Sequence, residues 1–388
     1  MKDILVVCPQ ERDVKAIRAA GLEDRYSVNF FGPDLDHVEE FDPVAFIAAS
    51  DEVPADGVVG TKDLSALLAA LIARRRGLPG PTPEALLACQ HKPTSRRIQQ
   101  SVAPAATPDF ARFDGRPPFD YPFFAKPVVG RLSQAAHRID NAAELAELVE
   151  ITSYTSRYAS IATLAGADPE SVHGFLAEEL LLGDEVTLEG YAHDGRVVPI
   201  GITDSIKYPG TFSFERFEYP SRLEQSCREE LCDVANRVIP ALGFEGGFFN
   251  VEFFIPERGP AQIIEVNGRL ASQFAPLVLG LHGRSTYDAL FEVAMGENPH
   301  WQTGRPSRFG LSYVMRVFAD AYVEEVPEPE DNLEVLVAPG CNLSQQGVND
   351  AESFRLAILY GFGDTREEAL EGCRERAEAL TFRLAPVR

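Results

Sequence analysis

The chain has 388 residues, of which 45% are hydrophobic and 24% charged, a globular composition long enough for two or three domains. Its 36 Lys and Arg against 59 Asp and Glu give a formal net charge of −23, which disfavours nucleic acid and anionic lipid as partners because such a surface repels their phosphates. No segment approaches the roughly 20 consecutive apolar residues that a membrane span needs.

Residues 1–90 alternate short strands with helices, which predicts a small parallel α/β domain. We expect strands at ILVVC, SVNFFG, VAFIAAS and GVVG. The helices are DVKAIRAAG and DLSALLAALIARRRG, the second with a basic last turn and Gly77 as its stop. No G-x-G-x-x-G follows the first strand, so a dinucleotide site is disfavoured.

A Pro-rich linker with Pro79, Pro81 and Pro83 leads into helix pieces within PTPEALLACQHKPTSRRIQQS. A second Pro-rich stretch, residues 104–122, precedes the strand FFAKPVV. The strand FLAEELLL then closes a predicted small α+β module at residues 91–182.

From residue 183 the pattern predicts antiparallel strands. Asp194-Gly195 is a strong hairpin turn between two strand-like runs. The helix SRLEQSCREELCDVANRVIPALG follows, and then a second hairpin, GGFFNVEFFIPERGPAQIIEVNGR. Beyond it we expect the strand FRLAILYGFGD and the helix TREEALEGCRERAEAL.

The cysteines and histidines indicate whether a zinc site is expected and in which cellular compartment the protein functions. The six cysteines form no C-x-x-C pair and the seven histidines form no cluster, so a zinc site is not expected. The start MKDILVVCPQ lacks the basic leader and cleavage site of a signal peptide. Scattered cysteines without such a leader indicate a reducing cytoplasm, and we expect a cytoplasmic protein.

The second hairpin is the most informative segment. Side chains alternate faces along a strand, so Asn250 and Glu252 share one face, and Glu265 and Asn267 likewise share one. A tight turn at residues 258–259 would place Glu252 opposite Glu265 and Asn250 opposite Asn267.

Two facing carboxylates repel unless something positive lies between them. Cross-strand Cβ atoms lie roughly 4.5–5.5 Å apart, close enough for Glu252 and Glu265 to bind one Mg²⁺ or a pair. Asn267 adds a neutral oxygen, and Arg269 could hold a transferring phosphoryl group or an acyl phosphate. The alternative is a solvated face of ordinary polar residues, which the long apolar flanks disfavour.

The segment IIEVNGR resembles the magnesium signature of ATP-grasp ligases, E-x-N-x-R, with Glu252 as the acidic residue of the preceding strand. The resemblance covers most of the chain and is nearest to the L-amino acid ligases, which form dipeptides, while GDTREEAL resembles the end of biotin-carboxylase-like members. It implies an ATP-grasp fold with an N-terminal Rossmann-like parallel α/β domain at residues 1–90. It also implies a small lid subdomain at residues 91–182 and a large antiparallel-sheet domain at residues 183–388. The lid that closes would span about residues 104–180.

The resemblance implies ATP with Mg²⁺, or Mn²⁺, as cofactors. Lys92 in CQHKPTSRR and Lys126 in FFAKPVVG match the family's two phosphate-contacting lysines. Lys207 in DSIKYPG matches a lysine that approaches the γ-phosphate in the D-alanine ligase branch. Each has a surface-lysine alternative, which is weakest for Lys126 because apolar residues and a proline flank it.

The loop that covers the phosphates departs from the family pattern. Where that pattern reads K-P-x-x-G-x-G-S-x-G, this chain has KPVVGRLSQAA. Gly130 and Ser133 match and keep a phosphate-binding role, whereas Leu132 and Ala135 replace glycines. A stiffer loop offers fewer free N–H groups to phosphate, and Arg131 could compensate with charge.

The strand FLAEELLLGDE resembles the hinge that holds adenine. The resemblance implies that Glu178 and the backbones of Glu179 and Leu181 contact adenine. Glu185 would bind the ribose hydroxyls, since a carboxylate accepts hydrogen bonds from a diol. Candidates for the apolar surroundings of the base are Leu180, Leu182 and Phe254. Ordinary core packing explains the leucines equally well.

The implied reaction activates a carboxylate, that of an amino acid, as an acyl phosphate and transfers the acyl group to an amine. Arg269 and Lys207 are the catalytic candidates, and Glu252, Glu265 and Asn267 the metal ligands. The substrates would be small carboxylates and amines, with no nucleic acid or membrane partner, and the resemblance leaves room for a homodimer.

The family's E-x-N-P-R is here E-V-N-G-R followed by LASQF, which suggests an atypical substrate. Specificity is expected near Glu218, Tyr219, Ser272 and Gln273.

Two other functions stay open. One is a carboxylase-type or purine-pathway enzyme that activates bicarbonate or formate, which the C-terminal segment slightly favours. The other is a non-catalytic nucleotide-binding module, which the altered phosphate loop motivates.

Overall fold

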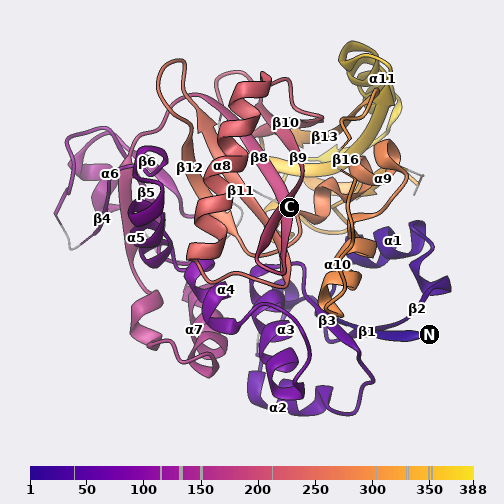
Figure 1. Cartoon of the computed structure of the whole chain (residues 1–388). Coiled ribbons are helices and arrows are strands. Elements are labelled where there is room, and N and C mark those ends of the chain that lie inside the picture. The colour runs from indigo at the N-terminus through magenta and orange to yellow at the C-terminus, as the bar shows by residue number, and fades with distance from the viewer. Residues whose placement is uncertain are drawn as a thin grey trace.

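We describe the chain from a computed structural model that covers residues 1–38, 40–113, 116–130, 134–148, 152–211, 213–302, 304–328, 330, 332–347, 350 and 353–388. Its strands form a three-stranded, a four-stranded and an eight-stranded sheet and a two-stranded ribbon (Figure 1). Short 3-10 helices lie at Leu22–Asp24, Leu35–His37, Pro104–Ala106, Pro169–Val172, Ser272–Phe274 and Leu343–Gln345. No helix in the described ranges is long and apolar enough to span a bilayer.

The N-terminal sheet is parallel, with strand order β2-β1-β3, as predicted. Its strands are β1 (Lys2–Val7), β2 (Tyr26–Phe31) and β3 (Gly57–Val59). The accompanying helices are α1 (Glu11–Ala19), α2 (Pro43–Ser50) and α3 (Asp63–Arg76). Gly77 ends α3 in the left-handed conformation, with φ 66°, which glycine adopts without steric cost.

One predicted strand is wrong, because VAFIAAS forms most of α2. The Asp42 side chain accepts hydrogen bonds from the N–H groups of Val44 and Ala45, and Pro43 occupies the first turn. Both features favour a helix start, and they outweigh the strand-like apolar run. Ile47 faces the core while Val44 is 61% exposed.

The four-stranded sheet has the order β4-β7-β5-β6 and forms one flank of the molecule (Figure 1). Its strands are β4 (Phe110–Arg112), β5 (Phe123–Pro127), β6 (His137–Ile139) and β7 (Phe175–Glu179). The helices of this region are α4 (Pro83–Gln90), α5 (Lys92–Val102), α6 (Ala142–Ala146) and α7 (Thr152–Leu164). Helix α7 packs against α3, and its Arg157 donates to the carbonyls of Leu35 and Val38. It is therefore tied to the N-terminal part, although it lies within residues 104–180.

The eight-stranded sheet has the order β12-β11-β8-β9-β10-β13-β16-β15, and all its neighbouring strands are antiparallel. Its strands are β8 (Asp184–His193), β9 (Arg196–Lys207), β10 (Phe214–Tyr219), β11 (Gly247–Ile255), β12 (Gln262–Asn267), β13 (Phe309–Val317), β15 (Leu333–Val335) and β16 (Phe354–Gly363). The ribbon joins β14 (Tyr322–Glu325) and β17 (Arg383–Ala385). The remaining helices are α8 (Gln225–Ala241), α9 (Ala275–His282), α10 (Thr286–Ala294) and α11 (Arg366–Ala379).

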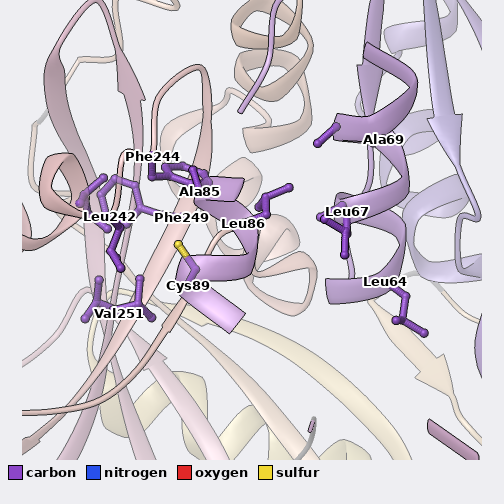
Figure 2. Close-up of a cluster of buried hydrophobic side chains, with 14 of the residues drawn as sticks. Leu64, Leu67, Ala69, Ala85, Leu86, Cys89, Leu242, Phe244, Phe249 and Val251 are labelled. Atoms are coloured by element: carbon purple, nitrogen blue, oxygen red, sulfur yellow. The ribbon is translucent and has the colours of Figure 1, made fainter. Parts of the chain in front are cut away.

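Helix α4 connects the N-terminal part to the large sheet through one hydrophobic core. Leu86 and Cys89 of α4 lie between Leu67 of α3 and Phe249 and Val251 of β11 (Figure 2). All five side chains are nearly inaccessible to solvent, and each fully buried large apolar side chain contributes about 1.5–3 kcal/mol. This packing fixes the start of α5, which follows α4 directly, against the β11–β12 hairpin.

Candidate active site

The β11–β12 hairpin has the predicted register. Glu252 lies opposite Glu265, and Asn250 lies opposite Asn267. The Asn267 amide donates to Asn250 Oδ1 at 2.9 Å and to Glu252 Oε1 at 3.2 Å. The turn contains Gly259 with φ 99°, a left-handed position that suits glycine. The two carboxylates and the amide oxygen of Asn267 therefore lie within one small area.

Both lysines predicted to contact phosphate lie beside this hairpin. Lys92, the first residue of α5, places Nζ 2.9 Å from Glu265 Oε1. Lys126 on β5 places Nζ 2.8 Å from Glu178 and donates to the Ile264 carbonyl at 3.0 Å. Both side chains are buried, so the surface-lysine alternative is wrong for both.

Arg96 completes this cluster and was not anticipated from the sequence. It forms a two-pronged ion pair with Glu178, at 2.7 and 3.1 Å, and donates to the Ile264 carbonyl at 2.7 Å. Its position four residues after Lys92 puts both cations on one face of α5, which is the signal that could have revealed it. Burial opposes the charge of Glu178, but Arg96 and Lys126 outweigh it and lower the pKa to about 2.

The facing carboxylates have opposite pKa shifts. Burial, and then the charges of Glu265 and Glu185, raise the pKa of Glu252 to about 8. For Glu265, burial is outweighed by Lys92 and Lys126, so its pKa lies below the usual value. These opposite shifts favour a protonated Glu252 beside an ionised Glu265 near neutral pH.

Lys207 lies next to Glu185. Lys207 is predicted to approach the γ-phosphate, and Glu185 is predicted to bind the ribose. Lys207 Nζ is 3.0 Å from Glu185 Oε2, and their side chains are 28% and 11% exposed. The ammonium also lies over the rings of Phe214 and Phe254, 5.6 and 5.3 Å from their centroids. Lys207 is thus held at the end of β9 and is not a freely solvated loop residue.

The hinge residues after β7 differ in exposure. Glu179 is exposed, Leu180 and Leu181 are partly buried, and Leu182 is 72% exposed. Core packing therefore does not explain Leu182. The Glu178 carboxylate is engaged by Arg96 and Lys126, so it anchors the hinge. Ser133 and Arg131 lie outside the described residues.

Arg269 is held by a residue of the N-terminal part. Its Nε lies 2.7 Å from Asp63 Oδ1, and its terminal nitrogen lies 3.4 Å from Asn267 Oδ1. Asp63 is the first residue of α3, where the helix dipole favours a carboxylate. The sequence did not single out Asp63, because its partner is 206 residues away.

A small pocket opens beside the carboxylate pair. Gln90 donates to the Asp63 carbonyl and accepts from the Tyr158 hydroxyl, both at 2.9 Å. The residues that line the pocket are Asp63, Gln90, Val129, Gly130, Tyr154, Tyr158, Glu265 and Asn267. The hairpin, α3, α4 and α7 thus meet around one opening.

Three of the four residues expected to set specificity have internal partners. Glu218 accepts a hydrogen bond from Arg216 at 2.8 Å, and the Tyr219 hydroxyl lies 2.7 Å from His282 Nε2. Gln273, in the 3-10 helix Ser272–Phe274, donates to Ser312 of β13 at 3.1 Å. Ser272 belongs to the same short helix.

Glu189 is a further buried carboxylate that the sequence analysis missed. It lies in register with Asn250 on the neighbouring strand and accepts the Ala271 N–H at 2.7 Å. Burial raises its pKa to about 8, although Ala271 and Arg269 act in the other direction. It therefore fastens the turn that follows Arg269.

Residues 119–276 match the ATP-grasp domain family. The chain therefore contains an ATP-grasp domain. This match contains the hinge, the carboxylate pair and Arg269, so the predicted ATP-grasp fold and domain are confirmed. Among the described residues no three His, Cys, Asp or Glu side chains gather into a metal site. Two carboxylates and an amide oxygen nevertheless fit Mg²⁺, which commonly takes its remaining ligands from water and phosphate.

Solved structures share this ATP-grasp architecture over nearly the whole chain. An L-amino acid ligase from Bacillus licheniformis matches with a TM-score of 0.80 at 20% identity, covering 99% of this chain and 98% of its own. The biotin carboxylase domain dimer of the Hydrogenobacter thermophilus 2-oxoglutarate carboxylase, in complex with MgADP and bicarbonate, matches with a TM-score of 0.70 at 16% identity, covering 99% and 91%. A biotin carboxylase from Campylobacter jejuni matches with a TM-score of 0.67 at 16% sequence identity, covering 99% of this chain and 92% of its own. At these identities the likeness shows the fold alone.

A sequence relative adds no activity to this picture. An uncharacterised protein of Sinorhizobium fredii is 30% identical over 220 residues, which is 54% of this chain. The aligned part spans 42% of that relative's length.

Proposed function

We propose that this ATP-grasp protein is an ATP-dependent, ADP-forming ligase that activates a carboxylate as an acyl phosphate and transfers the acyl group to an amine. The observation that carries the proposal is the facing pair Glu252 and Glu265. The pair is partly buried, beside Lys92 and Lys126 and close to Arg269. This arrangement supplies oxygen ligands for a cation and positive side chains for phosphate in one place.

Glu252, Glu265 and Asn267 would hold Mg²⁺ or Mn²⁺, which would neutralise the negative charge that develops during phosphoryl transfer. Lys92 and Lys126 lie within reach of the same area and would hold the phosphates. A lysine suits this role because its point charge can follow a phosphate through the reaction.

Arg269 and Lys207 are the proposed catalytic residues. Arg269, oriented by Asp63, would stabilise the acyl phosphate and then the tetrahedral oxyanion formed when the amine attacks. Lys207 would leave Glu185 to approach the γ-phosphate, and Glu185 would then be available to the ribose hydroxyls. Ser133 keeps its proposed phosphate contact.

The adenine site is proposed at the hinge after β7. The backbones of Glu179 and Leu181 would bind the edge of the base, with Glu178 anchoring the strand. Leu182, which is 72% exposed, would be covered by the base, and Leu180 and Phe254 would complete the apolar surroundings.

We propose that the chain divides into domains at residues 1–90, 91–182 and 183–388. The part that moves as a lid would be smaller than the expected residues 104–180. Because α7 is tied to α3 and to the carbonyls of Leu35 and Val38, the lid would consist of the four-stranded sheet. Its closure would exclude water, which hydrolyses acyl phosphates.

The test is a screen for ADP release over pairs of amino acids, with bicarbonate and formate as separate additions. The proposal expects ADP release that requires both a carboxylate and an amine. ADP release with bicarbonate alone would favour the carboxylase-type alternative, and nucleotide binding without any turnover would favour the non-catalytic one. The Glu265→Ala variant should fold but lose turnover, and full activity in it would remove Glu265 from the mechanism.

A further inference from the structure

The start of helix α5 is joined to the base of the four-stranded sheet, beside which the helix lies (Figure 1). The Lys92 N–H donates to the Val128 carbonyl at 3.1 Å, and the Val128 N–H donates to the Gly174 carbonyl at 2.9 Å. Val128 directly follows β5, and Gly174 directly precedes β7. The end of β5 and the start of β7, the two central strands of the sheet, are therefore connected to the first residue of α5.

His91, the residue before α5, adds a side-chain contact to this connection. Its Nε2 lies 3.1 Å from the Ser171 carbonyl oxygen. Its Nδ1 lies 2.8 Å from Thr94 Oγ1 and 3.3 Å from the Thr94 nitrogen. Ser171 belongs to the 3-10 helix Pro169–Val172, just before β7, and Arg112 of β4 donates to the same carbonyl at 3.3 Å. The Ser171 carbonyl thus connects the sheet with the start of α5.

These partners fix which ring nitrogen of His91 carries the hydrogen. A carbonyl oxygen can only accept, so Nε2 donates to Ser171 and Nδ1 is the acceptor in the neutral ring. Arg97 donates to Thr94 Oγ1 at 3.0 Å, which leaves the hydrogen of the Thr94 hydroxyl to point at Nδ1. Both nitrogens of the ring are therefore in use.

The surroundings of His91 favour this neutral ring. Burial lowers its pKa, although the Ser171 carbonyl acts in the other direction. The charges of Arg112, Arg97 and Lys92 lower the pKa further. At neutral pH the ring is therefore uncharged, and Nδ1 keeps its capacity to accept.

The Nδ1 contact is the N-cap of α5. The Thr94 N–H lies in the first turn of the helix, where backbone N–H groups have no partner within the helix. An acceptor in the preceding residue fixes the direction in which the helix starts. It thereby fixes the first residue, Lys92, whose Nζ lies 2.9 Å from Glu265 and whose side chain is 8% exposed.

We propose that His91 is a positioning residue for Lys92 and couples this lysine to the base of the four-stranded sheet. One ring nitrogen sets the start of α5, and the other holds the segment that leads into β7. Nucleotide affinity would then depend on the position of the sheet that we propose as the lid. The inference rests on the proposed nucleotide site of the ligase and adds to it a residue that touches no ligand.

The experiment measures the dissociation constant of a non-hydrolysable ATP analogue with Mg²⁺ by calorimetry, which requires no turnover. His91→Ala removes both contacts of the ring. It is expected to weaken binding roughly 10-fold, which corresponds to the loss of about one helix cap or one hydrogen bond.

Two further variants separate the contacts of the ring. His91→Asn places an amide oxygen near the position of Nδ1 and keeps the cap, whereas His91→Gln places an amide nitrogen near Nε2 and keeps the contact with Ser171. Each is expected to weaken binding about 3-fold, because each loses one of the two hydrogen bonds.

A double-mutant cycle shows whether His91 acts through Lys92. In a Lys92→Met background, His91→Ala should weaken binding by less than about 2-fold, because no ammonium is left to position. His137→Ala, at an exposed position on β6 of the same sheet, should leave binding unchanged in both backgrounds. Melting temperatures without ligand establish that each variant is folded during the titration, and where His91→Ala is not, His91→Asn and His91→Gln take its place in the cycle.

The outcomes separate the inference from the proposed function. Wild-type affinity in His91→Ala, or an equal loss with and without Lys92, would overturn the inference and leave the proposed ligase standing. A wild-type protein that does not bind the analogue would overturn the proposed nucleotide site, and the ligase function and the inference with it.

Discussion

The proposed phosphate-binding and catalytic cations are each paired with a carboxylate in the ligand-free protein. Lys92 pairs with Glu265, Lys126 with Glu178, Lys207 with Glu185, and Arg269 with Asp63. A buried charge without a partner is costly, so these pairs keep the site stable until ligands arrive. Binding of metal and nucleotide would then exchange internal partners for external ones.

Glu252 is the member of the facing pair that costs stability in the absence of metal. Because burial and Glu265 raise its pKa, we expect Glu252→Gln to be more stable than wild type at pH 9 in EDTA, by on the order of 1–3 kcal/mol. Thermal denaturation of both proteins with EDTA or with Mg²⁺ and nucleotide checks this. The stabilisation by Mg²⁺ and nucleotide should be largely lost in the variant, and an undiminished shift would show that Glu252 is no ligand.

Glu189 gives a pH dependence of known sign. Its folded pKa, about 8, lies above the ordinary value of 4.5, so folding takes up a proton between those pH values. The stability it contributes is therefore complete below pH 4.5 and is lost as the pH rises through about 8. Measured by urea denaturation, the advantage of Glu189→Gln over wild type should grow from pH 5 to pH 9, to on the order of 1–3 kcal/mol. A difference that stays constant with pH would refute this assignment.

At the scale of elements, helix α5 organises the side of the site where we propose that phosphate binds. Its first residue, Lys92, reaches the hairpin, and Arg96, one turn later, fastens Glu178 of β7 and the Ile264 carbonyl of β12. One helix thus sets the distance between the hinge and the carboxylate pair.

This role predicts a large effect on stability. Arg96→Met should destabilise the protein by about 3–5 kcal/mol, because it leaves Glu178 buried with a weakened set of partners. Arg97→Ala, at the neighbouring exposed position, should change the free energy of unfolding by no more than about 0.5 kcal/mol. Chemical denaturation measures both, and similar values for the two variants would contradict the role given to Arg96.

The elements also show what the sequence could predict. The β11–β12 register followed from strand alternation and a glycine-containing turn, since both are local. The apolar run of α2 has the pattern of a buried strand, but the Asp42 cap and Pro43 in the first turn make it a helix. Local patterns therefore gave the hairpin and most helices correctly, and failed where a cap outweighed composition.

At the scale of the whole molecule, the site is assembled from parts distant in the sequence. The N-terminal part contributes Asp63 to Arg269, and one core runs from α3 through α4 to β11. A signature motif identified Glu265, Asn267 and Arg269, but no sequence pattern could place Asp63 beside Arg269, Arg96 beside Glu178 or Glu189 beside the Ala271 N–H. Those partners depend on tertiary packing alone.

The central claim is that Glu252 and Glu265 face each other because a divalent cation binds between them. A crystal structure with Mg²⁺ and a non-hydrolysable ATP analogue tests it most directly. We expect the ion between the two carboxylates, with Asn267 as a further oxygen ligand and Lys92 turned from Glu265 toward the phosphates. A triphosphate bound elsewhere, with no metal at the pair and the Lys92–Glu265 contact intact, would contradict the claim.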